Sequence, residues 1–230
     1  MCAPAVAGVR RGLIAKRAYD ETAKEARRQA ILDAADRLFA EASDGLPSAA
    51  EIAEAAGLAK GTVYLYFDTK EDIFAALLLE GWGRAMDALE ESFVEAGRSR
   101  EALPVFLSRF VAMMKGRPNL MRLDAYDNGM LERKMTSAAV IAFKTAFLAR
   151  LERVGAVLDD ALGLNAGSGL KLLARSHAIT RGLWQTVGSP AGAESAANSL
   201  DAFAEELLET LTHYWRGALS EASAGEAPRL

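Results

Sequence analysis

The 230-residue sequence predicts an all-α fold, and three observations support this prediction. Proline is scarce, with 6 residues, and alanine, a strong helix former, occurs throughout the chain. Apolar residues recur at helical spacing, first at Ile31, Ala34, Ala35, Leu38 and Phe39. The chain has 230 residues, of which 51% are hydrophobic, and this is enough to form one or two domains that each have a hydrophobic core.

Composition excludes several classes of protein. The formal net charge of −4 excludes a strongly basic chain, although it leaves room for a local basic face. Cys2 is the one cysteine, so no intrachain disulfide is possible, and with 2 histidines no His/Cys metal site and no cofactor are expected. There is no apolar run of 18 residues and no convincing signal peptide, so we expect a cytoplasmic protein.

The first segment, residues 1–22, is predicted to be a flexible basic tail. It carries Arg10, Arg11, Lys16 and Arg17, with no acidic residue before Asp20. Two interpretations stay open, a solvated arm or an arm that contacts the DNA backbone or minor groove. At the other end of the chain, residues 221–230 are predicted to be a flexible C-terminal tail.

Two helices are expected next, within a domain that spans residues 23–71. The first begins near Thr22 and stops at the turn residues "SDGLP". The second begins in "PSAAEIAEAAG", where Ser48 can cap the helix and Glu51, three residues later, can complete a capping box. Gly57 is expected to end this second helix with a tight turn.

The stretch "GLAKGTVYLYF" (57–67) contains bulky residues typical of a strand, but an isolated strand would have no partner. As a helix, it places Val63 and Phe67 on one face, toward the core. Tyr64 and Leu65 then point away from that core and form a contact surface. A long helix capped by Asp68 or Thr69 should follow, with interruptions expected at Gly81 and Gly83.

A short helix, a glycine turn and a second short helix together form a helix-turn-helix, whose second helix fits the major groove of DNA. The residue types here suit that purpose. Lys60 can donate to guanine or to phosphate, Gly61 lets the backbone approach a base, and Tyr64 can contact a thymine methyl group. Arg27 and Arg28 are further candidates for contacts with the DNA backbone.

The stretch "RRQAILDAADRLFAEASDGLPSAAEIAEAAGLAKGTVYLYFDTKEDIFAALL" resembles the DNA-binding domain of the TetR family, the tetracycline-repressor-like bacterial regulators, and the resemblance covers about residues 25–78. The runs "EIA..AG" and "KGTVY.YF..KE" carry most of the resemblance. It implies base or groove contacts from Lys60, Gly61, Thr62, Tyr64 and Leu65. It also implies phosphate contacts from Ser48, Ala49, Tyr66 and Lys70.

The chain departs from the family pattern at two of these positions. The family commonly has a hydroxyl residue where Ala49 stands, so that phosphate contact is expected to shift to Ser48 or to backbone amides. Leu65 replaces an aromatic or polar residue and is limited to apolar contact.

The second half, residues 72–220, also reads as helical. Helices are expected at 79–97, 101–116, 119–132, 136–163, 167–188 and 195–218. The resemblance implies that this half binds a small-molecule effector and forms a homodimer through its last two helices. Two recognition helices would then lie one DNA turn apart, roughly 34–36 Å, and read a palindromic operator.

An effector pocket is expected between the middle helices. From an apolar set that also includes Phe106, Met113 and Phe143, the candidates are Phe110, Met114, Met121, Tyr126, Met130, Phe147, His177 and Trp184. The methionines suit varied apolar shapes. Arg122, Asp124, Tyr126 and His177 are the residues expected to give this region polarity, although many of these side chains are expected to be ordinary core.

These features predict a DNA-binding transcriptional regulator, namely a homodimeric repressor that a small, largely apolar effector releases from its operator. An enzyme is disfavoured, since no nucleotide-binding loop or nucleophile motif is present and the pairs Asp159/Asp160 and Glu205/Glu206 look like solvated helix faces. A ligand-binding dimer that has lost DNA binding is the alternative, favoured by Ala49. Repression and activation are not distinguished by the sequence.

Overall fold

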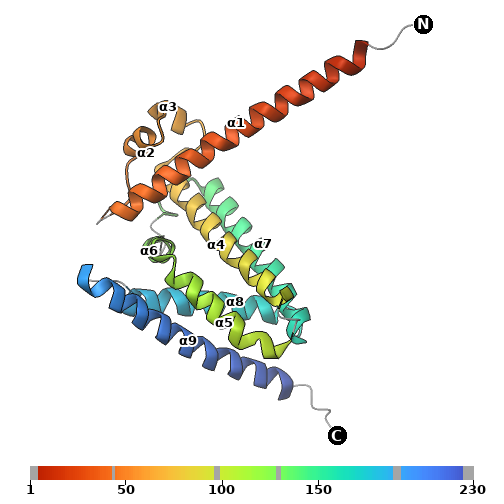
Figure 1. Ribbon diagram of the computed structural model, residues 1–230, viewed down its shortest axis with the longest axis vertical. Helices are drawn as coiled ribbons and strands as arrows, with labels where there is room; N and C mark the ends of the chain where they lie inside the picture. The colour runs from red at the N-terminus through yellow and green to blue at the C-terminus, as the bar shows by residue number, and fades with distance from the viewer. Residues whose placement is uncertain (1–4, 43–44, 96–98, 128–130, 189–192, 225–230) are drawn as a thin grey trace. The chain divides into compact units, whose positions relative to one another are not determined.

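The computed structural model describes residues 5–42, 45–95, 99–127, 131–188 and 193–224, and all regular secondary structure in these ranges is helical (Figure 1). The chain divides into two compact units, Met1–Phe74 and Ala75–Leu230, which are described separately below. The all-α prediction is confirmed. No helix among the described residues is long and apolar enough to cross a membrane.

Helix α1 spans Ala5–Glu41 and so begins well before the start expected near Thr22. Residues 5–22, expected to be a tail, are part of this helix. The reason is visible in the sequence, because Pro4 is the last proline before Pro47 and alanine is frequent in between. The basic residues of this segment therefore lie on a helix and not on an extended arm.

Helix α2, Ala49–Ala55, begins with the predicted capping box. The Glu51 backbone N–H donates to Ser48 Oγ at 3.3 Å, and the Ser48 N–H donates to the Glu51 carboxylate at 2.8 Å. After α2 the chain turns at Gly57, whose φ of 67° is a left-handed conformation that favours glycine. Arg37 of α1 donates to the carbonyl of Ala55 at 3.2 Å and so holds the end of α2 against α1.

The strand-like stretch forms a helical turn, as predicted. Helix α3 spans Lys60–Val63, and the N–H groups of Tyr66 and Phe67 continue the turn by donating to the carbonyl of Val63. Val63 and Phe67 are buried, at 1% and 7% exposure, and pack in the core of the first unit. This burial fixes the orientation of the helix and leaves its opposite face in solvent.

Helix α4, Lys70–Glu95, begins with Thr69 as its cap. The N–H and hydroxyl of Thr69 both donate to the Asp72 carboxylate at 2.8 Å, and the Asp72 N–H donates back to Thr69 Oγ1. The helix continues through Gly81 and Gly83, so the prediction that these residues interrupt it is wrong. Both glycines instead permit close contacts, which are described below.

The second unit contains η1 (Arg100–Ala102), α5 (Leu103–Lys115), α6 (Pro118–Asp127), α7 (Ser137–Leu162), α8 (Ser168–Leu183), the π-helical turn η2 (Trp184–Gly188) and α9 (Ala193–Ala224). Helix α5 lies beside α9, and α7 lies beside α8 (Figure 1). Phe93 and Trp215 both pack against Phe106, with ring centroids 4.3 and 5.3 Å from it, and the three rings form an aromatic cluster in this core.

Helices α7 and α8 approach so closely that their backbones touch. A Cβ atom added to Gly169 would lie 2.2 Å from the carbonyl oxygen of Gly155, and one added to Gly155 would lie 2.6 Å from the N atom of Leu170. The Asp159 carboxylate accepts hydrogen bonds from the N–H groups of Gly167 and Gly169 at 2.7 and 2.6 Å. Asp159 therefore caps the start of α8, and the prediction that it is merely a solvated side chain is wrong.

We expect Gly169→Ala to destabilise the second unit by about 3 kcal/mol, because backbone atoms and not flexible side chains would have to move. All three tryptophans belong to this unit, so thermal unfolding followed by tryptophan fluorescence measures its stability. Gly116→Ala is the matched control, since Gly116 has φ −73° and a Cβ there would meet its nearest atom at an ordinary 3.4 Å. Equal melting temperatures for the two variants would contradict the close contact.

Candidate DNA-binding and effector-domain sites

The recognition-helix residues form one solvent-facing surface of the first unit. Tyr64 is 45% exposed and Leu65 is 81% exposed, so two large side chains lie next to each other in solvent. The Lys60 ammonium lies 6.0 Å from the centroid of the Tyr64 ring, so the two side chains share this face. A Cβ atom on Gly61 would meet no heavy atom of the described residues within 4 Å, so the backbone there is open to a close-approaching group. Thr62 is partly buried beside them.

The residues expected to contact phosphate lie at two helix starts. Ser48 Oγ accepts the capping hydrogen bond of α2, so its hydroxyl proton remains available to a phosphate oxygen. Ala49 is the first residue of α2, and although its side chain is 6% exposed, its N–H has no acceptor within the helix. Lys70 Nζ donates to the carbonyl of Leu46 at 3.2 Å and keeps further donors for a second partner. Tyr66, four residues before Lys70 in the sequence, is partly buried.

A carboxylate also lies in this region. Hydrogen bonds from Ser48, together with the positive charge of Lys70, lower the pKa of the Glu51 carboxyl. Glu51 is therefore ionised at neutral pH and favours neither a phosphate nor the major groove by itself. The positive charge of Lys70 lies near enough to offset part of this negative charge.

The second unit contains a buried polar cluster centred on Asp124, which is 1% exposed. Arg181 donates to both carboxylate oxygens, from Nε at 2.8 Å and from Nη2 at 3.0 Å. Trp82 Nε1 donates at 3.0 Å, and His177 Nε2 lies 3.1 Å from the same oxygen. The His177 ring also contacts Trp82 edge-on and Phe147, with centroid distances of 4.6 and 5.5 Å. The cluster therefore joins α4, α6, α7 and α8.

Burial alone would raise the pKa of Asp124, but the hydrogen bonds and charges of His177 and Arg181 outweigh it and lower the pKa to about 2. Asp124 is thus a buried carboxylate at neutral pH, and the hydrogen on the facing nitrogen of His177 must point toward it. The sequence had placed Asp124 and His177 in one polar region. It missed Trp82 and Arg181, and it had named Arg122 as the arginine.

The lowered pKa of Asp124 predicts acid lability of the second unit. A pKa of about 2, below the usual 3.8, means that the carboxylate stabilises the fold above about pH 4 and that this stability is lost as the pH falls toward 2. The loss amounts to about 2 kcal/mol. Urea unfolding between pH 6 and 2.5, followed by tryptophan fluorescence, measures it. A control variant, Asp124→Asn, should show a shallower dependence on pH in this range, and identical profiles would contradict the assignment.

The predicted effector-pocket residues fall into two groups. Phe110, Met114, Met121 and Trp184 are buried at 6%, 0%, 0% and 4% exposure and pack within the helical core. Tyr126, Phe147 and His177 are partly buried, and the last two lie at the Asp124 cluster. Met130 lies outside the described residues. The sequence pattern could not separate these groups, because core and pocket residues have the same helical spacing.

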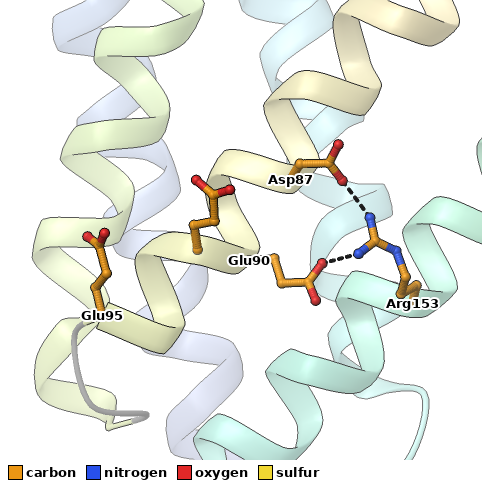
Figure 2. A pocket seen from close by; sticks show the side chains of 5 residues that line it. Asp87, Glu90, Glu95 and Arg153 are labelled. Atoms are coloured by element: carbon orange, nitrogen blue, oxygen red, sulfur yellow. Dashed lines mark hydrogen bonds and ion pairs between the residues drawn. The ribbon is translucent and has the colours of Figure 1, made fainter.

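A hollow of about 600 Å³ lies on the second unit, where the sequence had indicated no site. It is lined by Asp87, Glu90, Glu91, Glu95 and Arg153. Figure 2 shows the Arg153 guanidinium of α7 bridging the Asp87 and Glu90 carboxylates of α4. Arg109 lies 3.0 Å from Glu95 and offsets its charge. The four carboxylates still outnumber the two arginines, so the hollow keeps an excess of negative charge that repels anionic ligands.

The first unit presents a lysine, an aromatic ring and an exposed leucine on the second helix of a helix-turn-helix, and this arrangement defines a DNA-binding protein of the helix-turn-helix class. Residues 31–77 match "Bacterial regulatory proteins, tetR family", and residues 79–222 match "Tetracyclin repressor-like, C-terminal domain". The protein belongs to the TetR family, as its sequence resemblance indicated. It is a DNA-binding transcription regulator and not an enzyme.

Two curated relatives match part of the chain. The "Fatty acid metabolism regulator protein" of Bacillus subtilis (strain 168) is 37% identical over 90 residues, which make up 39% of this chain and 46% of that protein. The "HTH-type transcriptional repressor BepR" of Brucella suis biovar 1 (strain 1330) is 35% identical over 80 residues, 35% of this chain and 36% of that protein. The chain thus spans less than half the length of these relatives.

Solved structures show the same fold over most of the chain. The transcriptional regulator FadR from Bacillus subtilis, in complex with stearoyl-CoA, superposes with a TM-score of 0.51 at 24% identity, covering 80% of this chain and 96% of that one. The fatty acid degradation regulator FadR from Bacillus halodurans superposes with a TM-score of 0.54 at 21% identity, covering 80% and 94%.

Proposed function

We propose that this protein is a cytoplasmic, homodimeric repressor that binds a palindromic operator and leaves it when a long-chain acyl-CoA binds the C-terminal domain. The observation that carries the DNA-binding part is the exposure of Tyr64 and Leu65, at 45% and 81%, on a helix whose other face is buried. A monomeric domain gains nothing from exposing these side chains, whereas thymine methyl groups in a major groove would cover them.

The outer faces of the last two long helices support a dimer. On α8, Ala174, Ala178 and Gly182 follow one another at intervals of four residues and are exposed. A Cβ atom on Gly182 or on Gly217 of α9 would meet no described heavy atom within 4 Å. Small residues in such a row let a second helix approach closely. A two-fold pair of these helices would give the dimer that a palindromic operator requires.

The effector class rests on the relatives and on the character of the second unit. One curated relative is named for fatty acid metabolism, and one solved structure of the same fold holds stearoyl-CoA. In this chain, Phe143 and Phe147 of α7 are partly exposed, with ring centroids 6.3 Å apart, and Phe147 borders the Asp124 cluster. Aromatic side chains of this kind suit the apolar chain of an acyl group.

Helix α4 supports a route by which the effector changes DNA binding. Its first residue, Lys70, belongs to the first unit and bonds to Leu46 there, whereas Trp82 belongs to the second unit and bonds to Asp124 of α6. An effector that displaces α6 would shift this helix and with it the spacing of the two recognition helices. The affinity for DNA would then fall by the effector's differential binding to the two states, typically about 1–3 kcal/mol of coupling.

The test is to select bound fragments from the source organism's own DNA at physiological salt, to footprint them, and to titrate the complex with stearoyl-CoA. We expect the protein to protect a short palindrome near a promoter, with one or more dimers bound at each site. We also expect stearoyl-CoA, but not CoA alone, to release the protein from this DNA. Binding without release would overturn the effector class. No selective binding at any salt concentration would favour a ligand-binding dimer that has lost its DNA-reading function.

A further inference from the structure

His177 of α8 lies where α4, α6, α7 and α8 meet. Its ring contacts Trp82 of α4 edge-on, with centroids 4.6 Å apart, and Phe147 of α7, with centroids 5.5 Å apart. Its Nε2 atom lies 3.1 and 3.2 Å from the two carboxylate oxygens of Asp124 of α6. These contacts hold the imidazole ring in one orientation, so each of its two nitrogens has a defined environment.

The other partners of Asp124 decide which nitrogen of His177 carries the hydrogen. Trp82 Nε1 and the Arg181 guanidinium are donors only, so the Asp124 carboxylate accepts from both. Nε2 of His177 faces the same carboxylate, and a hydrogen on Nε2 lets it donate there as well. Arg181 already supplies a positive charge to Asp124, so a neutral imidazole satisfies the cluster. In that neutral ring Nδ1 keeps its lone pair and is a hydrogen-bond acceptor.

This acceptor is unused within the described part of the chain. The two nitrogens of an imidazole ring point in nearly opposite directions, so Nδ1 of His177 is directed away from Asp124. No described residue forms a hydrogen bond with Nδ1, and 17% of the His177 side chain is exposed. Because Nδ1 is not a buried atom, water or a ligand can reach it.

An apolar surface adjoins the His177 ring. Phe147, which contacts that ring, also stacks on Phe143 one turn earlier on α7, with centroids 6.3 Å apart and an angle of 15° between the ring planes. Both phenylalanines are partly exposed. A ligand that complements these three rings has an apolar chain followed by an N–H or O–H donor.

We infer, on the basis of the proposed function, that His177 Nδ1 accepts a hydrogen bond from the cysteamine amide N–H of an acyl-CoA whose acyl chain lies on Phe143 and Phe147. The thioester carbonyl is an acceptor only, and this amide, one ethylene link beyond the sulfur, is the first donor after the chain. The ionised head group of a free fatty acid has acceptors only, and the Nδ1 lone pair disfavours it. His177 therefore selects the CoA thioester over the free acid, and Asp124 holds the imidazole in the tautomer that makes this selection.

The first measurement is nitrogen-15 NMR of the full-length protein labelled at histidine, at about pH 8, where an unperturbed imidazole is neutral. The chain has 2 histidines, so His213→Gln assigns the signals of His177. We expect the free protein to carry hydrogen on Nε2 and not on Nδ1. Stearoyl-CoA should move the Nδ1 signal toward that of a hydrogen-bonded nitrogen, and stearate should leave it in place. Hydrogen on Nδ1 of the free protein, or an unchanged Nδ1 signal at saturation with stearoyl-CoA, would overturn the inference and leave the proposed function standing.

A matched pair of ligands isolates the donor. The N-acetylcysteamine thioester of dodecanoic acid carries the amide N–H without any phosphate, and S-ethyl dodecanethioate has the same chain and thioester but no donor. Isothermal titration calorimetry should show that wild type binds the first about three- to tenfold more tightly. His177→Phe keeps a ring against Trp82 and Phe147 and should bind both ligands alike. His213→Gln, at an exposed position of α9, should keep the wild-type preference. Melting temperatures establish that each variant is folded.

The outcomes separate this contact from the effector class. Equal affinity of wild type for the two thioesters, or a preference that persists in His177→Phe, would show that His177 does not receive the amide, whereas release of the operator by stearoyl-CoA would still support the proposed function. If only stearoyl-CoA binds, the Nδ1 signal decides alone. If wild type binds neither stearoyl-CoA nor either thioester, the proposed effector class fails, and the inference fails with it.

Discussion

Replacing both Lys60 and Tyr64 with alanine is expected to abolish specific operator binding while the protein stays folded and dimeric. Both side chains are exposed, and neither supports the core of the first unit, which depends on Val63 and Phe67. Each lost contact with a base or phosphate should cost about 1–3 kcal/mol, so the double variant should bind the operator at least about thirtyfold more weakly. Fluorescence anisotropy with a labelled operator measures this loss.

Salt dependence separates the two roles that Lys60 can have. If its ammonium contacts a phosphate, Lys60→Ala lowers the slope of log affinity against log salt by about 0.9 and weakens all sequences alike. If it contacts a guanine, the slope changes little and one operator position loses its base preference. Lys144→Ala, which removes an exposed lysine paired with Glu132 in the second unit, is the control and should leave binding unchanged. Undiminished binding by the double variant would refute the assignment of this surface.

Asp124→Asn is expected to destabilise the second unit by about 3–5 kcal/mol, which lowers its melting temperature by on the order of 10 °C. The amide keeps the size of the carboxylate, but its NH2 group faces donors from His177 and Arg181, and the partly buried guanidinium of Arg181 loses its counter-charge. Tryptophan fluorescence during thermal unfolding follows this transition. Asp201→Asn, in an exposed ion pair with Lys115, should shift it by less than about 1 kcal/mol. A melting temperature of Asp124→Asn within 2 °C of wild type would show that the cluster contributes no stability.

The first unit could be predicted almost entirely from the sequence, since its signals are local. The capping box at Ser48 and Glu51 and the helical face of Val63 and Phe67 depend on residues three or four positions apart. One departure is the early start of α1 at Ala5, where basic residues suggested a tail and alanine content favoured a helix.

The second unit could be predicted only as a series of helices. The bond from Arg181 to Asp124 joins residues far apart in the chain, and no periodic pattern announces such a partner. Gly81 and Gly83 looked like helix interruptions because glycine has a low helix propensity, yet they mark the places where Leu120 and Arg150 press against α4. A glycine's role depends on what approaches it, and the sequence does not contain that information.

The contact between Gly155 and Gly169 limits how the second unit can change shape. Packed helices usually adjust by sliding a little along one another. Here a slide of one residue would push the side chain of Val154 or Leu170 into a gap that cannot hold a single methyl group. We therefore expect helices α7 and α8 to keep their relative position when the unit changes shape. A change of shape on ligand binding is then expected between helices that meet through flexible side chains, as α4 and α6 do through Leu120. The distance between two helix backbones thus indicates which pairs of helices in this unit can shift.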